Sequence, residues 1–208
     1  MNAHAGSKPR PFAALIALWL ACVAAIAIVR SGDPNAFAVH ELASSPAAVA
    51  AGRLWTLVTS AFIIDGPSVP QIVMTALVAA AVVRLGGAGT FALSAVAGHI
   101  GATLLAYLGI AAVSIVDPAT AHGVVHAPDY GISAVWAASI GTLLVLVHRS
   151  GAHPRVTAAI GVVLLVTFLA LVEIDGELAD VEHLLAFLIG VGIATIRSPS
   201  GRLARLKV

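Results

Sequence analysis

The chain has little charge, few aromatic residues and a single cysteine. Of its 208 residues 10% are charged and 5% are aromatic, whereas 60% are hydrophobic, and the mean hydropathy is +1.01. One cysteine, Cys22, excludes an intrachain disulfide framework. A formal net charge of +1 excludes the strongly basic surface that nucleic-acid binding needs, so no nucleic-acid partner is expected. Because so few polar residues remain to cover a surface in water, the composition predicts a membrane protein.

Long apolar stretches are what the chain has instead. Crossing a bilayer takes about 20 apolar residues in a helix. The sequence predicts an all-α, polytopic bundle built as one domain over residues 1–208, with six spans at 12–29, 69–85, 89–112, 130–148, 155–173 and 181–197. The first stretch follows Lys8 and Arg10, as in a signal peptide, but no A-x-A-like cleavage site follows it. We interpret it as a retained helix.

The distribution of charge predicts the orientation of the bundle. With the N-terminus inside, nine of the eleven basic residues fall on the inner side, and only Arg30 and Arg53 fall outside. This asymmetry follows the positive-inside rule, so both termini are predicted to be cytoplasmic, with 198–208 as a basic cytoplasmic tail. An excess of arginine over lysine and abundant alanine are typical of bacterial proteins. The expected location is therefore the plasma (inner) membrane, with the lipid bilayer as a partner.

The longer connections are all predicted on the outer side, at about 30–68 and 113–129. Within the first, residues 47–62 are apolar and contain Arg53 and Trp55, which is typical of a segment lying at the membrane interface. The inner connections are short. Because functional residues concentrate on irregular segments held by a rigid scaffold, we expect a site on the outer side.

Two residues that can carry chemistry begin spans of the same direction. Ser133 and His183 each lie a few residues inside a span, at similar predicted depth. Both are followed by small residues at helical spacing, which let helices approach closely: Ala137 and Gly141 after the serine, Ala186 and Gly190 after the histidine. A serine nucleophile and a histidine base on facing stripes can act together as a hydrolytic pair. Alternatively, the serine bonds its own helix and the histidine lies at the interface.

The remaining histidines offer weaker alternatives. His122 and His126 are four residues apart, the spacing of two metal ligands on a helix, but Gly123 and Pro128 argue against a helix there. No metal and no other cofactor is predicted. His99, in the middle of the third span, can be a proton relay, a ligand or a buried polar group bonded to a neighbouring helix, and we favour the last. Glu182 precedes His183 directly and therefore points about 100° away from it, so it is not assigned to a triad.

Three segments together resemble the rhomboid family of intramembrane serine proteases. Residues 53–62, RLWTLVTSAF, are similar to the family's W-R-x-x-T-x-x-F segment with the tryptophan and arginine shifted, and residues 131–134, GISA, are similar to its G-x-S-G nucleophile motif. His183, with Ala186 and Gly190 after it, resembles the family's sixth-helix histidine. The resemblance covers about 53–197. It implies Ser133 as the nucleophile, His183 as the general base, no metal, and single-span membrane proteins as substrates.

The sequence departs from the family pattern around the oxyanion site. Ala134 replaces the glycine after the nucleophile, and Gln71 and Thr75 stand at the spacing where the family has histidine and asparagine. The resemblance thus implies Gly131, Gln71 and Thr75 at the oxyanion and substrate position. Where the family has an aromatic residue four positions after the serine this chain has Ala137, with Trp136 one residue earlier.

These departures leave more than one function open. The sequence favours a rhomboid-like protease that cleaves near the outer membrane face. The alternative is an inactive, rhomboid-like pseudoprotease that binds transmembrane helices of client proteins as an adaptor or quality-control factor. A small transporter using His99 is disfavoured because the spans hold almost no charge. The sequence assigns no oligomeric state.

Overall fold

The computed structural model describes residues 11–33, 39–64, 66–151, 153–174 and 176–197. The predicted basic tail, 198–208, lies outside these residues. Six of the described helices are long and apolar enough to cross a membrane: α1 (Pro11–Gly32), α5 (Ser68–Gly86), α6 (Ala88–Val116), α8 (Ile132–Arg149), α9 (Pro154–Ile174) and α10 (Leu178–Ile196). Their ends lie close to the predicted ones, the largest difference being at the end of α6, predicted at 112 and found at Val116. The predicted all-α, six-span bundle is confirmed.

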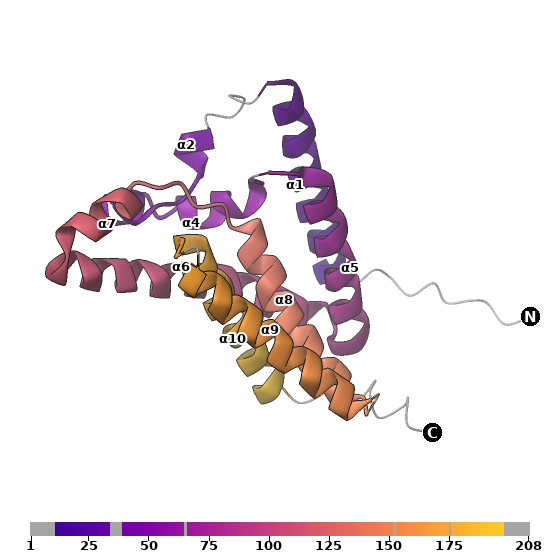
Figure 1. The fold of residues 1–208 in the computed structure, drawn as a ribbon. Helices are drawn as coiled ribbons and strands as arrows, with labels where there is room; N and C mark the ends of the chain where they lie inside the picture. The colour runs from indigo at the N-terminus through magenta and orange to yellow at the C-terminus, as the bar shows by residue number, and fades with distance from the viewer. Residues whose placement is uncertain (1–10, 34–38, 65, 152, 175, 198–208) are drawn as a thin grey trace, which may run out of the picture.

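Helix α8 is the centre of the bundle. Half of its residues, 50%, are buried inside the protein, against 11% for α9 and 6% for α1. It packs against α10, α6 and α5, while α9 covers α8 and α10 from outside (Figure 1). Because lipid tails are as apolar as the side chains that face them, the peripheral helices keep apolar residues exposed all along their length.

The short helices gather at one end of the bundle, which we call the loop-rich end. It comprises α2 (Val39–Leu42), α3 (Pro46–Ala50), α4 (Thr56–Thr59), η1 (Ser60–Phe62) and α7 (Pro118–Val125), and α8 and α10 both begin there (Figure 1). Residues 47–62, expected to lie at the interface, form short helices joined by a turn, and Trp55 in that turn is 56% exposed. The Arg53 guanidinium lies 5.8 Å from the centre of the Trp55 ring and donates to the Glu41 carbonyl.

Helix α7 corrects one prediction. A helix around His122 was judged improbable because of Gly123 and Pro128, yet α7 runs through His122 and Gly123 to Val125. A glycine inside a helix costs only about 1 kcal/mol relative to alanine, and Pro118 occupies the first helical position, where proline is favoured. Pro128 lies beyond the end of the helix. Within the described ranges, no three histidine, cysteine, aspartate or glutamate residues lie where they could hold a metal ion.

An arginine holds the opposite end of the central helix pair. Arg149, at the last residue of α8, donates to the Ala194 carbonyl at 2.7 Å, the Thr195 carbonyl at 2.8 Å and the Arg197 carbonyl at 3.2 Å. The final carbonyls of a helix have no partner within it, and a positive charge there also favours the helix dipole. Arg149 therefore fixes the end of α10 to the end of α8.

Candidate active site

Ser133 lies in the first turn of α8. Gly131 is the residue before the helix, with φ −81° and ψ −6°, and Ser133 follows two residues later. The Ser133 hydroxyl is half-buried and donates to the Tyr130 carbonyl at 3.3 Å. The first N–H groups of a helix have no partner within it, so the backbone around Ser133 can offer donors to an anion.

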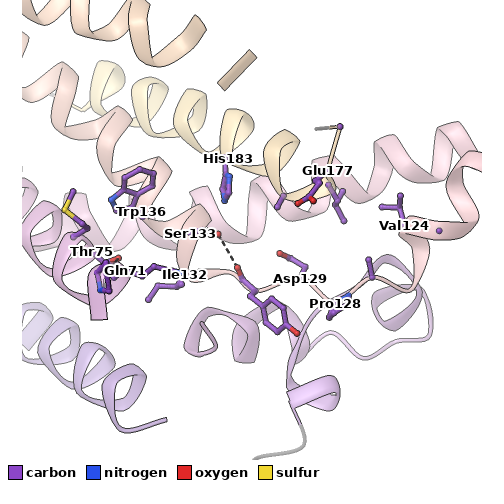
Figure 2. A pocket seen from close by; sticks show the side chains of 18 residues that line it. Gln71, Thr75, Val124, Pro128, Asp129, Ile132, Ser133, Trp136, Glu177 and His183 are labelled. Atoms are coloured by element: carbon purple, nitrogen blue, oxygen red, sulfur yellow. Dashed lines mark hydrogen bonds between the residues drawn. The ribbon is translucent and has the colours of Figure 1, made fainter. Parts of the chain in front are cut away.

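His183 lies in the second turn of α10 and projects over the start of α8 (Figure 2). Its ring and the Ser133 side chain border the same cavity. In the structure the Ser133 hydroxyl bonds the Tyr130 carbonyl rather than the histidine ring, so the two predicted residues share a cavity without a hydrogen bond between them. Such bonds often tighten only when substrate is bound.

The cavity has a volume of about 840 Å³ and lies at the loop-rich end, between the starts of α5, α8 and α10. Gln71 and Thr75 line it from α5, Ser133 and Trp136 from α8, and His183 from α10 (Figure 2). Its volume is typical of sites that hold small molecules or a few residues of peptide. Ser133, His183 and Gln71 bring polar groups to the cavity that can interact with a peptide bond, and Trp136 brings an indole N–H.

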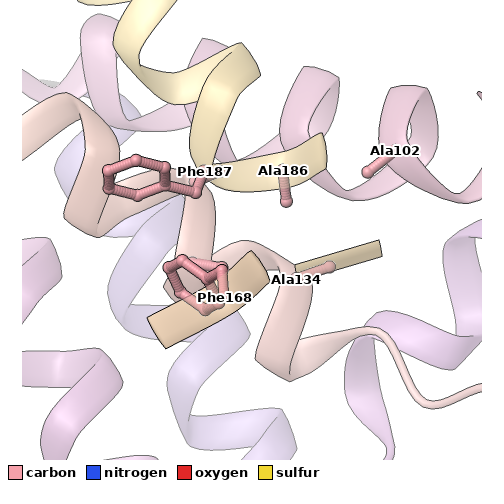
Figure 3. Packing of buried hydrophobic residues seen from close by; sticks show 7 residues of the cluster. Ala102, Ala134, Phe168, Ala186 and Phe187 are labelled. Atoms are coloured by element: carbon pink, nitrogen blue, oxygen red, sulfur yellow. The ribbon is translucent and has the colours of Figure 1, made fainter. Parts of the chain in front are cut away.

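Small residues bring α8 and α10 together below the cavity. Ala137 and Ala186 are fully buried there, and Figure 3 shows the surrounding cluster, which includes Ala134, Ala186 and the neighbouring rings of Phe168 and Phe187. A Cβ at Gly190 would collide with the Ala138 carbonyl oxygen, and one at Gly141 would collide with the Phe187 carbonyl oxygen.

The close approach also permits an interhelical hydrogen bond. The Thr142 hydroxyl on α8 donates to the Gly190 carbonyl on α10 at 3.0 Å. With carbonyls and small side chains in direct contact, the two helices are held as a pair. Ser133 and His183, at the loop-rich ends of these two helices, are therefore positioned by the tightly packed helix pair.

Comparison with known proteins places the chain in a family. The family model for rhomboid-like proteins matches residues 13–202, from α1 to beyond the end of α10. The chain belongs to that family. The searches of curated proteins and of solved structures give no match. The match to rhomboid-like proteins therefore extends beyond the three short segments to all six candidate spans.

Two of the residues assigned to the oxyanion position have hydrogen-bond donors that are already engaged. The Gly131 N–H donates to the Ser60 carbonyl at 3.1 Å, and the buried Thr75 hydroxyl donates to the Gln71 carbonyl of its own helix at 2.7 Å. The Gln71 side chain lines the cavity. Gly131 and Thr75 could therefore donate to an oxyanion only after breaking these bonds.

His99 supports the start of α8 from below. Its Nε2 lies 3.2 Å from the Ser60 hydroxyl, and the residue is 3% exposed and outside the lining of the cavity. A Cβ at Gly131 would collide with the imidazole ring, so the ring packs directly against the backbone of Gly131. The sequence favoured a buried polar group bonded to a neighbouring helix. The partner is a neighbouring helix, as predicted, namely the short 3-10 helix η1 of the loop-rich end.

A group of buried polar residues beside the cavity was missed by the sequence reasoning. Glu182 is 1% exposed and accepts a hydrogen bond from the Thr103 hydroxyl at 3.3 Å. Asp129, also buried, lines the cavity and accepts from the Tyr107 hydroxyl at 3.3 Å. Burial raises the pKa of the Asp129 carboxyl above its ordinary value of 3.8. Glu182 faces α6 and not His183, in agreement with its exclusion from a triad.

Proposed function

We propose that this rhomboid-like protein is an intramembrane serine protease with Ser133 as nucleophile and His183 as general base. The observation that carries the proposal is the shared cavity: both side chains border it, from two helices locked together by small residues. The family match supports a rhomboid-like membrane protein, and the cavity supports the chemistry.

The proposed reaction begins when the Ser133 hydroxyl turns from the Tyr130 carbonyl toward His183. His183 takes the hydroxyl proton while Oγ attacks the carbonyl carbon of the scissile peptide bond, giving a tetrahedral oxyanion. His183 then gives this proton to the leaving amine, and the C–N bond breaks. His183 then takes a proton from a water molecule, whose oxygen attacks the acyl ester. As the C–Oγ bond breaks, His183 gives this proton to Ser133 Oγ and the acid product is released.

The oxyanion requires donors that are aimed at it before the reaction. We assign this role to N–H groups in the first turn of α8, which lack partners within the helix, and to the Gln71 side chain because it lines the cavity opposite Ser133. Gly131 and Thr75 take part differently, since their donors hold η1 and α5 in place. Gly131 lets the backbone approach His99, and Thr75 closes the cavity wall.

The proposed substrates are single-span membrane proteins. A segment in a transmembrane helix has its peptide groups hydrogen-bonded internally, so it must unwind before a carbonyl can reach Ser133. The cavity, bordered by Pro70 and Met74 of α5 as well as by the site residues, has room for a short unwound segment. With both termini cytoplasmic, as the charge distribution predicts, the loop-rich end faces outward and cleavage occurs near the outer surface of the plasma membrane.

Cleavage of a model single-span substrate by the purified protein tests the proposal. Ser133→Ala and His183→Ala should each abolish cleavage, while Ser139→Ala should retain it, because Ser139 lies on the same helix with its hydroxyl bonded to the Val135 carbonyl. Substrate that is captured but not cleaved by the wild-type protein would overturn the protease proposal in favour of the helix-binding pseudoprotease. The Ser133 hydroxyl bonded to its own segment is the observation that favours that alternative.

A further inference from the structure

The buried carboxyl groups of Asp129 and Glu182 lie next to each other. Their hydroxyl partners, Thr103 and Tyr107, are one helical turn apart on the same face of α6. Held by hydroxyl groups one turn apart, the two buried carboxyl groups lie close enough to interact with each other. Asp129 precedes α8 and Glu182 belongs to α10, so the contact joins the segments that lead to Ser133 and His183.

Two carboxyl groups in contact cannot form a hydrogen bond unless one of them carries a proton. An ionised carboxylate only accepts hydrogen bonds, and two carboxylates side by side repel each other. No lysine or arginine contributes to the environment of either group among the residues that the structure describes. Glu182 Oε1 is buried without a hydrogen-bond partner among these residues. One proton shared between the two carboxyl groups would give the buried Glu182 oxygen a hydrogen-bond partner and would remove the repulsion between two carboxylates.

The backbone around Asp129 makes it a junction at the loop-rich end. Asp129 and Ser44 exchange two backbone hydrogen bonds, at 2.8 and 3.1 Å, so the segment is tied to the first long connection. Two residues further on, Gly131 is tied to Ser60. The interaction with Glu182 connects this segment to α10.

We propose that Asp129 and Glu182 share one proton in a carboxyl–carboxylate hydrogen bond, and that this bond is a positioning element that holds the Ser133 segment against the helix carrying His183. The hydrogen bond between the two carboxyl groups does not depend on the proposed function. Its expected effect on the reactivity of Ser133 rests on the proposed function. Both residues act through the site residues beside them and touch no reacting atom.

The contact between Asp129 and Glu182 is expected to weaken at high pH. When the shared proton leaves at high pH, two adjacent buried carboxylates remain, and their repulsion separates the start of α8 from α10. Among the described residues, the other titratable group facing the pair is Tyr107 from α6, whereas His183, the next residue after Glu182, borders the cavity. His99 lies on the same face of α6, one turn below Thr103.

Infrared absorption of the detergent-solubilised full chain tests the shared proton. At neutral pH the wild-type protein should show the carbonyl band of a protonated carboxyl group, and this band should be lost in Glu182→Gln and in Asp129→Asn, where an amide N–H replaces the proton. Glu173→Gln, at an exposed position of α9, is the matched control and should retain the band. A band that is absent from the wild type, or that survives in both amide variants, would overturn the proposal.

Thermal unfolding as a function of pH tests the positioning role without requiring protease activity. The wild-type melting temperature should fall at alkaline pH, and Glu182→Gln, with a permanent donor, should lose that fall while remaining folded. Superimposable profiles would refute the positioning role. The rate at which a fluorophosphonate labels Ser133 should show the same difference. If the wild type is not labelled at all, the proposed function fails. The infrared and unfolding results still show whether Asp129 and Glu182 share a proton.

Discussion

The substitution Gly131→Ala tests how closely the backbone before Ser133 packs against His99. The backbone at Gly131, at φ −81° and ψ −6°, is one that alanine adopts freely, so Gly131→Ala introduces no backbone strain. The added Cβ would instead occupy the position of the His99 ring. Either the ring must leave the Ser60 hydroxyl, to which it is bonded at 3.2 Å, or the start of α8 must move.

The expected cost follows from these two contacts. Overpacking a filled site costs about 1–3 kcal/mol, and the lost hydrogen bond adds roughly 0.5–1.5 kcal/mol. Gly131→Ala should therefore lower the free energy of unfolding by about 2–4 kcal/mol. Gly109→Ala is the matched control, because a Cβ there meets nothing within 4 Å and alanine favours the helix, so its effect should be neutral or slightly stabilising.

A double-mutant cycle measured by denaturant unfolding in detergent identifies the cause. His99→Ala removes the ring and leaves space for the methyl group of Ala at position 131. The two substitutions together should thus cost about 1–2 kcal/mol less than the sum of the separate costs. Costs that add within about 0.5 kcal/mol would show that His99 does not pack against Gly131, and the reasoning would be refuted.

Three further predictions concern the rest of the bundle. Gly190→Ala should destabilise the protein by about 1–3 kcal/mol in denaturant unfolding, because its Cβ meets the Ala138 carbonyl, whereas Gly192→Ala, with nothing within 4 Å, should not; equal effects would contradict the packing. Arg149→Lys should cost about 1–3 kcal/mol, since one ammonium group cannot reach the three carbonyls at the end of α10; an unchanged midpoint would argue against that anchor. The raised pKa of Asp129 means that the folded protein holds a proton that the unfolded chain releases, so the stability contributed by Asp129 is fully present below about pH 4 and is lost as pH rises through the raised value; in a pH series of melting curves Asp129→Asn should show a smaller fall than the wild type, and equal falls would be evidence against it.

The spanning helices could be predicted from the sequence because the bilayer leaves few alternatives. Backbone groups in lipid must be satisfied within the segment, so a long apolar run becomes a helix almost regardless of its neighbours. The helix ends were found within a few residues on this basis. Ser133 and His183 could be predicted to lie near each other because both lie near the start of spans that cross the membrane in the same direction. Both are also followed by small residues at helical spacing, which is visible in the sequence.

The surroundings of the site could not be predicted in this way. Glu182 and Asp129 are 53 positions apart, and their contact depends on how α6, α8 and α10 pack, which no spacing rule records. The partner of His99 lies in the η1 turn for the same reason. Helix α7 was missed because Gly123 lowers helix propensity locally, whereas the helix is stabilised by packing against α6 and α3.

Reaction of the purified protein with a fluorophosphonate, followed by mass-spectrometric mapping of the adduct, tests the central claim most directly. The account predicts an adduct on Ser133 that is formed in the wild type and in Ser139→Ala, and that is lost in His183→Ala because the base is missing. No adduct on Ser133, or one that forms equally well without His183, would contradict the assignment of these two residues as nucleophile and base.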